Sequence, residues 1–264
     1  MSKATSVTEN LSDTVSLERN GAIATLTINR PEQRNALNHS VLAGLRAGFA
    51  AFEADAALRV LILTATGDKA FCAGMDLKQA AATQIKVPPR DFLPVLGDNI
   101  HVTKPVIAAV NGLAYAGGWL LAQMCDLCIA ADHAVFGITE AKVGRGMPWA
   151  APLTRMLPQR VVMELLLTAQ PISAQRLYEL GYVNAVVPLP DLMSRAKAMA
   201  EQIAANAPLT VKAARELVYL SGEMGRSASL RAAHHLFESV YLSEDAQEGP
   251  RAFAEKRAPQ WQGK

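Results

Sequence analysis

Two glycine-containing turns hold the backbone groups of this sequence that are best placed to do chemistry. One spans residues 71–77 (FCAGMDL) and the other residues 116–119 (AGGW), and each follows an apolar run with the length of a buried strand. The N–H groups at a turn that opens a helix are unpaired, and the helix dipole adds positive potential there. Two such turns that converge would polarise a carbonyl oxygen as an oxyanion hole. From spacing alone, two ordinary strand-to-helix turns remain the alternative.

Other reactive side chains lack the spacing of known sites. No pair of the five histidines has the spacing of a helical zinc site with a third ligand nearby, so we expect no metal. Cys125 and Cys128 form a single C-x-x-C, which we interpret as two buried small apolar residues. The sequence has no Walker loop, no G-x-G-x-x-G after a strand and no G-x-S-x-G elbow. These absences argue against nicotinamide, ATP and serine-hydrolase chemistry.

The apolar pattern predicts the elements that position the first turn. Residues 22–28 alternate with period two, as a strand does, and the pattern stops before Pro31. Asn38 is a candidate N-cap for a helix whose apolar side chains recur at helical spacing until Asp55. Residues 59–65 form a continuous apolar run typical of a buried parallel strand. Together these segments predict a strand–helix–strand crossover.

The same kinds of pattern continue to the end of the chain. Residues 105–110 predict a second buried strand, followed by a helix at 119–125 and short strands at 127–130 and 135–136. Further helices are expected at residues 160–167, 174–180, 192–205, 210–220, 229–240 and 245–256. Residues 79–98 contain three prolines and no clear period, which predicts a loop with a partial helix. We therefore expect an α/β core followed by a helical part.

Composition limits the class of protein. The 264 residues suit one large domain, or a domain with a helical appendage, and half of them are hydrophobic, so a sizeable core can form. The 26 basic and 24 acidic residues leave a net charge of +2 without blocks of one sign, which argues against nucleic-acid or membrane partners. We recognise no membrane span and no signal peptide, and therefore expect a cytoplasmic protein with three reduced cysteines.

Five segments resemble, in order and spacing, the motifs of the crotonase, or enoyl-CoA hydratase/isomerase, superfamily. The resemblance covers the chain from about residue 15 to its end. The segments are residues 29–38 (NRPEQRNALN), 69–78 (KAFCAGMDLK), 104–126 (KPVIAAVNGLAYAGGWLLAQMCD), 136–144 (FGITEAKVG) and 252–257 (AFAEKR).

This resemblance implies a crotonase-like (ClpP/crotonase) α/β fold with a core of stacked β-β-α spiral turns and a C-terminal helical region. We expect a polar N-terminal lead at residues 1–14, the spiral core at 15–190 and a helical trimerisation region at 191–264. The expected partners are an acyl-CoA thioester as substrate and further copies of the chain, in a homotrimer or a dimer of trimers. Coenzyme A would belong to the substrate, so no separate cofactor is expected.

The resemblance also implies an oxyanion hole made by the backbone N–H groups of Met75 and Gly117, which belong to the two turns described above. The backbone around Ala73 and Gly74 would meet the adenine. Four further side chains match positions that commonly lie near the coenzyme A moiety, although solvated surface positions are an equal alternative for each: Lys69, Lys78, Phe253 and Lys256.

The acid/base residues depart from the hydratase pattern. Hydratases of this family carry two glutamates that hold a water molecule between them; Glu140 matches the second, but the first position falls on Leu120, which cannot transfer a proton. A single glutamate beside an aliphatic residue resembles the mitochondrial 3,2-enoyl-CoA isomerases. Trp149, after Pro148, points weakly the same way. The resemblance also implies that Leu120 and Trp149 line the substrate pocket, and Arg145 is either an extra polar group of that pocket or a surface residue.

Our leading hypothesis is therefore an acyl-CoA enzyme in which Glu140 shuttles a proton and moves a double bond. A hydratase that adds water to a 2-enoyl-CoA with the help of another acid is the alternative. A crotonase-like protein that binds acyl-CoA, or even RNA, without catalysis belongs to a different class. The absence of a basic helix disfavours RNA, and the presence of Glu140 disfavours an inactive protein.

Overall fold

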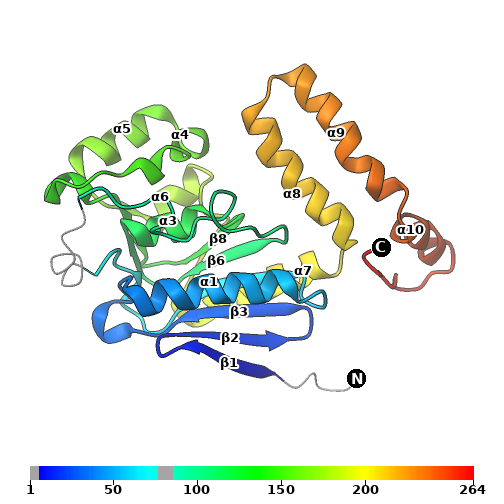
Figure 1. The fold of residues 1–264 in the computed structure, drawn as a ribbon, viewed down its shortest axis with the longest axis horizontal. Helices are drawn as coiled ribbons and strands as arrows, with labels where there is room; N and C mark the ends of the chain where they lie inside the picture. Colours follow the sequence, from blue (N-terminus) through cyan, green and yellow to red (C-terminus); the bar gives the residue numbers. More distant parts are fainter. Residues whose placement is uncertain (1–5, 77–85) are drawn as a thin grey trace.

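Two β-sheets form the core of the computed structural model, which describes residues 6–76 and 86–264 (Figure 1). The larger sheet has seven strands in the order β1-β2-β3-β4-β6-β8-β11, and the smaller has four in the order β10-β9-β7-β5. The strands of the large sheet are β1 (Val7–Ser12), β2 (Val15–Asn20), β3 (Ile23–Ile28), β4 (Val60–Ala65), β6 (Val106–Val110), β8 (Leu127–Ala131) and β11 (Ala185–Val187). Those of the small sheet are β5 (Ala70–Cys72), β7 (Leu113–Tyr115), β9 (Val135–Gly137) and β10 (Ile172–Ser173).

The path of the chain through the two sheets is a spiral. Strands β4, β6 and β8 pair in parallel in the large sheet, and each is followed by a strand of the small sheet, namely β5, β7 and β9. Strands β5, β7 and β9 also pair in parallel with one another. This repeated pair of strands is the unit of the predicted β-β-α spiral, and the predicted α/β fold class is confirmed.

The helices cover both faces of the large sheet or follow it in the chain. They are α1 (His39–Ala54), α3 (Gly117–Gln123), α4 (Leu153–Met156), α5 (Gln159–Thr168), α6 (Ala174–Glu179), α7 (Leu192–Ala204), α8 (Pro208–Glu223), α9 (Arg226–Tyr241) and α10 (Glu244–Ala254). Short 3₁₀ helices are η1 (Pro31–Gln33), η2 (Glu140–Val143), η3 (Pro148–Ala150) and η4 (Leu189–Asp191). Within the described residues, no helix has both the length and the apolar character needed to cross a membrane.

Burial on both faces explains why β4 is apolar throughout. All six of its residues are buried, which is typical of a parallel strand covered on both sides. On one face, Phe49 and Phe52 of α1 are completely buried in the main core. On the other, Ala196 and Ala200 of α7 pack against Ile62 and its neighbours in a second, smaller core. The large sheet is thus the fixed layer from which the turns of the spiral project.

The cap of α1 confirms a prediction from the sequence. The side chain of Asn38 accepts a hydrogen bond from the N–H of Val41 at 2.9 Å, as an N-cap residue does. The predicted positions of the C-terminal helices differ from the observed bounds by a few residues. The helix expected at residues 119–125 starts earlier, at Gly117. It begins there because Ala116, with a positive φ of 52°, lies outside the helical conformation and Gly117 directly follows it.

The two ends of the predicted domain division look different in the structure. The sequence predicts a polar lead at residues 1–14, but β1 within it pairs antiparallel with β2 at the edge of the sheet. Backbone pairing holds this strand without an apolar face, and Arg19 adds an ion pair to Glu9 at 2.8 Å. At the other end, α7 belongs to the core packing although it falls within residues 191–264. The trimerisation role of that region stays a prediction.

The C-terminal helices leave the core and return to it. Figure 1 shows α8 and α9 as an antiparallel pair that projects from the sheets, while α10 and the C-terminus lie on the opposite side of the molecule from α5. Asp126, just before β8, accepts hydrogen bonds from Arg215 and Tyr219 of α8 at 2.8 and 2.7 Å. These contacts tie the middle and second half of α8 to the end of the sheet.

Candidate active site

The turn after β5 is aligned by a short ladder with residues before α1. Met75 lies opposite Leu37 in an isolated parallel bridge. The N–H of Leu37 donates to the carbonyl of Gly74 at 2.8 Å, and the N–H of Asp76 donates to the carbonyl of Leu37 at 3.0 Å. Successive peptide groups of an extended strand point to opposite sides, so the N–H of Met75 points away from Leu37. The ladder therefore directs this N–H away from the loop that supports it.

Asn35 fixes that loop to the sheet. It is buried, has a positive φ of 54°, and its amide donates to the carbonyls of Ala70 and Thr66 at 2.7 and 3.0 Å. Next to it, the carbonyl of Arg34 accepts from the N–H of Ala73 at 3.0 Å. The segment that the sequence offered only as a family motif is thus a support for the turn that carries Met75.

The second turn leads from β7 into α3. The N–H of Ala116 donates to the carbonyl of Gly137 at 2.8 Å, and Gly117 is the first residue of the helix. The first N–H groups of a helix have no partner within it, so the N–H of Gly117 is available for an external acceptor. Gly118 packs so closely on β5 that a Cβ there would lie 2.0 Å from the carbonyl oxygen of Cys72. Only glycine permits this approach.

The two turns are in contact. A Cβ built on Gly74 would lie 2.8 Å from the Cβ of Ala116 and 3.5 Å from the backbone N of Gly117. Gly74 also has a φ of +90°, a backbone conformation that residues other than glycine rarely adopt. The structure therefore brings together the two segments that the sequence analysis paired, with Met75 one residue after Gly74.

The immediate surroundings of Gly117 are apolar. A Cβ on Gly117 would lie 2.9 Å from Cδ1 of Leu37 and 3.9 Å from Cδ1 of Leu93. Leu120, one turn further along α3, is only 2% exposed. In such surroundings a backbone N–H interacts strongly with a charged acceptor, because little water competes. Residues 77–85, with Lys78 and the start of the loop expected at 79–98, lie outside the described residues.

Glu140 is a buried carboxylate with one unpartnered oxygen. It is the first residue of η2 and is 8% exposed. The indole Nε1–H of Trp149 donates to its Oε1 at 2.9 Å, while Oε2 is buried with no hydrogen-bond partner among the described residues. Burial raises the pKa of Glu140, and hydrogen bonds from the backbone and from Trp149 oppose this rise. A carboxyl in this state can accept and return a proton.

Trp149 links Glu140 to the helix that follows the second turn. Its backbone carbonyl accepts a hydrogen bond from Nε2 of Gln123 at 3.0 Å, and Gln123 is a buried residue at the end of α3. Strand β9, which leads into the Glu140 loop, pairs with β7, which leads into the second turn. The carboxyl and the turn at Gly117 are therefore held to the same strand pair and the same helix.

The remaining residues expected at the site lie elsewhere or on the surface. Lys69 and Arg145 are exposed, although the backbone N–H of Arg145 donates to the carbonyl of Glu140 at 3.0 Å. Phe253, which is 87% exposed, and Lys256 belong to the α10 end of the chain, on the other side of the molecule from α5 (Figure 1). A single copy of the chain thus does not bring these two side chains to Glu140.

Sequence reasoning missed the hydrogen bond of Trp149 to Glu140 and the presence of Gln123 beside the candidate site. Trp149 was expected to line the pocket, but its indole is a hydrogen-bond donor to Glu140. Gln123 was not singled out, although it is the only polar side chain of α3 (GGWLLAQ) apart from the indole of Trp119, and a lone amide in an apolar helix is a usable signal. Its Oε1 is buried and has no partner among the described residues.

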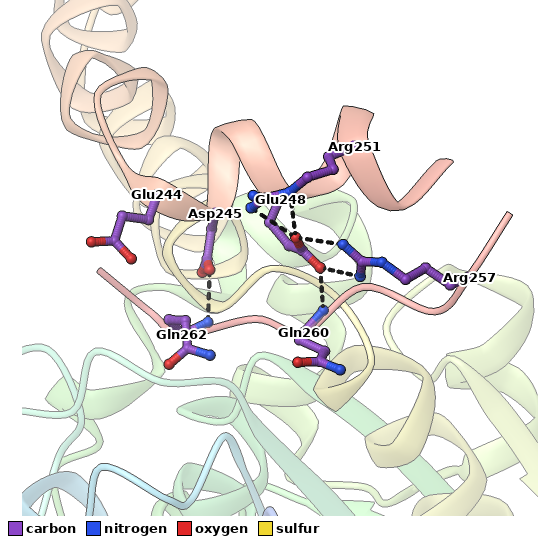
Figure 2. Close-up of a pocket in the computed structure, with 7 residues that line it drawn as sticks. All are labelled: Glu244, Asp245, Glu248, Arg251, Arg257, Gln260 and Gln262. Carbon is purple, nitrogen blue, oxygen red and sulfur yellow. Dashed lines mark hydrogen bonds and ion pairs between the residues drawn. The ribbon is translucent and has the colours of Figure 1, made fainter. Parts of the chain in front are cut away.

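A polar pocket at the C-terminal end contrasts with this site. It is lined by charged and amide side chains of α10 and the following tail, and its carboxylates are bonded to arginines and backbone N–H groups (Figure 2). Because the carboxylates of Asp245 and Glu248 already have donors on both oxygens, we interpret the pocket as a contact that holds the tail against α10 and not as a candidate reaction centre.

Among the described residues, the cysteines and possible metal ligands offer no second reaction centre. Cys125 and Cys128 are buried free thiols, as interpreted from the sequence, and burial raises the pKa of Cys128 to about 12 and that of Cys125 well above its usual value. In the part of the chain that the structure describes, no three His, Cys, Asp or Glu side chains form a group that could hold a metal ion.

Comparisons with known proteins agree with the motifs. The model of the enoyl-CoA hydratase/isomerase family matches residues 18–264. The chain is 38% identical to (E)-benzylidenesuccinyl-CoA hydratase of Thauera aromatica over 258 residues, which cover 94% of this chain and 99% of that protein. It is 39% identical to carnitinyl-CoA dehydratase of Salmonella arizonae over 267 residues, which cover 96% of this chain and 100% of that protein.

Solved structures show the same fold. The enoyl-CoA hydratase of Mycobacterium tuberculosis H37Rv superposes with a TM-score of 0.88 at 39% identity, covering 95% of this chain and 99% of that one. A probable enoyl-CoA hydratase/isomerase of Mycobacterium abscessus superposes with a TM-score of 0.86 at 38% identity, covering 96% and 100% of the two chains.

Proposed function

The chain belongs to the enoyl-CoA hydratase/isomerase family and is an enzyme of that kind, and we propose that Glu140 moves protons at the carbon beside an acyl-CoA thioester. In this proposal the N–H groups of Met75 and Gly117 hold the oxygen of the enolate that forms. The observation that carries it is the buried carboxyl of Glu140, with one oxygen fixed by Trp149 and the other without a partner among the described residues.

The two backbone donors would lower the energy of the enolate. When a proton leaves the carbon beside a thioester, negative charge moves to the thioester oxygen, and fixed donors stabilise that charge without reorganising. Loss of one such donor typically costs about 2.7 to 4 kcal/mol of transition-state energy. The contact between Gly74 and the N of Gly117 supports this pairing of the two turns.

The reaction that a single carboxylate suits best is double-bond migration. Glu140 Oε2 removes a proton from C2 of a 3-enoyl-CoA, and the electron pair of that C–H bond moves into the thioester to give a dienolate. The same oxygen then returns the proton to C4, the double bond moves to C2–C3, and the electrons leave the thioester oxygen. One base performs both steps, so Glu140 is recovered unchanged.

The side chain of Leu120 disfavours hydration. Adding water to a 2-enoyl-CoA requires a water molecule to be held and deprotonated while C2 is protonated, which a second carboxylate makes possible. Among the described residues the buried acids are Glu140, Asp245 and Glu248, and the last two line the C-terminal pocket. Leu120 is apolar and buried where the other acid would stand in the hydratase pattern.

Hydration or dehydration is the second candidate, because the two relatives named above are a hydratase and a dehydratase that align over nearly the whole chain. The amide of Gln123 would be the polar group available on α3 for this reaction, since its Oε1 is buried and without a partner among the described residues. This candidate predicts that the preferred substrate is a conjugated 2-enoyl-CoA or a 3-hydroxyacyl-CoA.

Absorbance of the conjugated thioester separates the two reactions. We expect the protein to raise this absorbance with 3-hexenoyl-CoA, because isomerisation creates the conjugated bond. It should lower the absorbance of crotonyl-CoA only slowly, and Leu120→Glu should increase that hydration relative to isomerisation. Rapid hydration of crotonyl-CoA with no action on 3-hexenoyl-CoA would instead assign the hydratase. Binding of both thioesters without turnover would point to a non-catalytic protein.

Because coenzyme A is part of the substrate, we expect no separate cofactor, and activity should survive a chelator.

We also propose that the chain assembles as a homotrimer or a dimer of trimers through its C-terminal helices. Large apolar side chains are exposed there, among them Val218, Leu230, Tyr241, Leu242 and Phe253. In such an assembly, Phe253 and Lys256 would meet the acyl-CoA of a neighbouring copy, since they lie away from Glu140 of their own chain. Light scattering should give a trimer or hexamer, and a stable monomer at micromolar concentration would contradict the assembly.

A further inference from the structure

We propose that Trp149 is a positioning residue, whose indole N–H holds Oε1 of Glu140 and thereby makes Oε2 the oxygen that exchanges protons with substrate. This inference rests on the proposed function of Glu140. A residue that only packed against substrate would not affect the proton affinity of Glu140. The inference therefore predicts that the acid/base chemistry changes when the indole N–H is removed.

The geometry gives the two oxygens of Glu140 different roles. Oε1 accepts the indole N–H at 2.9 Å, and Oε2 has no partner among the described residues although it is buried. A buried acceptor without a donor is costly, so it is rare in folded proteins and calls for an explanation. The proposed reaction provides such an explanation, because Oε2 acquires its partner only with the substrate, when it takes a proton from carbon. Fixing Oε1 also fixes the plane of the carboxyl group and the direction in which Oε2 faces.

Trp149 is itself held through its backbone and through its ring. The backbone carbonyl of Trp149 accepts from Gln123 Nε2 at 3.0 Å, which anchors η3 to α3. The ring is only partly exposed and packs against the main core. The contact therefore joins two segments through buried groups, and it is not a chance meeting of mobile surface side chains.

The charged residues around Glu140 lie at the surface, in the part of the chain that the structure describes. In its own loop they are Lys142 and Arg145, and on α5, which packs against η2, they are Arg160 and Glu164; all four residues are exposed. Burial is the main cause of the raised pKa of Glu140, and the hydrogen bond from Trp149 lowers it. Trp149 is thus a side chain that stabilises the ionised form of the base.

Replacing Trp149 by Phe keeps most of the ring and removes the N–H. The ionised form of Glu140 then loses a donor, so its pKa rises, and the base becomes available only at higher pH. We expect the acidic limb of the kcat/KM profile to move up by about one pH unit, because a hydrogen bond to a charged group has about that strength. The kcat on the plateau above this limb should fall by about tenfold, because the carboxyl loses the contact that orients it, with little change in KM. Trp261→Phe removes an indole N–H that donates to the carbonyl of Ala205, and this matched control should leave the limb in place.

The readout can be made independent of the overall reaction. Exchange of the C2 protons of butyryl-CoA in D2O breaks a C–H bond and protonates Glu140. The Glu140 proton then exchanges with solvent, and a deuteron returns to C2, whichever product the enzyme normally forms. If Glu140→Gln leaves this exchange unchanged, the proposed function fails. If the exchange depends on Glu140 but Trp149→Phe does not move its pH limb, only the role of Trp149 is overturned.

A measurement on the unmodified protein covers the case in which Trp149→Phe does not fold. One of the three indole N–H signals in the NMR spectrum should titrate with Glu140, and it should stop titrating in Glu140→Gln. Gln123→Met, which removes the anchor of Trp149, should move the acidic limb in the same direction by a smaller amount. An indole spectrum without any signal that responds to Glu140 would overturn the proposal.

Discussion

Two buried carboxylates at different places in the molecule have opposite environments. Glu140 receives one side-chain hydrogen bond, from Trp149, and burial raises its pKa. Glu248 of α10 accepts from the guanidinium of Arg257 and from the N–H of Gln260, which hold its pKa at about 2 (Figure 2). A carboxylate whose two oxygens both have strong donors has lost much of its affinity for protons, whereas a buried one with an unpartnered oxygen keeps it.

The contrast extends to the backbone around each carboxylate. Near Glu248, Asp245 accepts from the N–H groups of Gln262 and Gly263 at 2.7 and 2.9 Å, so the tail is closed against α10. Near the candidate active site, by contrast, the ladder beside Leu37 directs the N–H of Met75 away from its supporting loop, and the N–H of Gly117 is the first of α3 and has no partner within that helix. Groups that the fold satisfies serve stability, and groups that it leaves open are the ones available for chemistry.

The largest test of this contrast is the loss of the carboxylate at Glu140. Glu140→Gln should lower the rate of isomerisation by at least about 100-fold, since general acid–base groups contribute that much or more. Binding of the CoA ester should change little, so the loss should appear in kcat and not in KM. Steady-state kinetics with 3-hexenoyl-CoA measure both, and Glu248→Gln is the control that should keep its kcat.

A methyl group on Gly74 tests the contact between the two turns. Ala at this position must adopt a φ of +90° and place its Cβ 2.8 Å from Ala116 and 3.0 Å from the carbonyl of Tyr115. The turns must then separate, and a displacement of about 1 Å at a reacting centre can cost about 100-fold in rate. We expect kcat/KM of Gly74→Ala to fall by up to this amount. Full activity would show that the two turns act independently.

Removing the saturated acceptor at the other end should affect stability and not rate. Asp245→Ala leaves the N–H groups of Gln262 and Gly263 without their acceptor, which should cost about 1 to 3 kcal/mol of unfolding free energy. Urea unfolding measures this loss. A fall in kcat that is not explained by unfolding would mean that the tail takes part in the reaction.

The same substitution at the two glutamates should have opposite effects on stability. The folded-state pKa of Glu248 lies below its usual 4.5, so its ionised form stabilises the fold above that pH, and this stability is lost as the pH falls towards about 2. The folded-state pKa of Glu140 is raised, so its ionisation opposes folding once the pH exceeds the usual value. At neutral pH, Glu248→Gln should lower Tm and Glu140→Gln should raise it. Shifts of the same sign in both variants would contradict the comparison.

The smallest expected effect is at a glycine in the saturated region. A Cβ on Gly249, within α10, would meet the ring of Trp261 at 3.4 Å, which is ordinary contact. Gly249→Ala should change the stability by no more than about 1 kcal/mol, because the better helix propensity of alanine is opposed by crowding between its Cβ and the ring of Pro250, and it should leave kcat unchanged. Chemical denaturation of this variant, beside Gly74→Ala, compares the same change in the two regions.

Much of the fold could be predicted from local patterns. Buried strands such as β4 are continuous apolar runs, and α1 has an N-cap and an apolar stripe, so each is visible in the sequence. Strand β1 was missed because its residues VTENLS carry no apolar face and gain their order from pairing with β2. The short strands β5 and β7 were missed because three residues are too few to show a period.

The candidate site was predictable where it depends on motifs, and not where it depends on tertiary contacts. Glycines at the two turns and the glutamate at residue 140 stand at family positions, so the sequence shows them. The hydrogen bond from Trp149 to Glu140 depends on how η3 folds back on η2, and that from Gln123 joins residues 26 positions apart. No periodicity encodes such contacts, because they arise only when the elements pack.

Because of the ladder beside Leu37, the side chain at residue 75 can vary in evolution more freely than a catalytic side chain could. The bonds that direct the N–H of Met75 belong to the backbone of Leu37, Gly74 and Asp76, so the identity of the side chain at residue 75 does not enter them. Every amino acid except proline supplies the same N–H. In the proposed role of this N–H, the side chain at residue 75 can therefore change to suit a different acyl group while the backbone donor to the thioester oxygen stays the same.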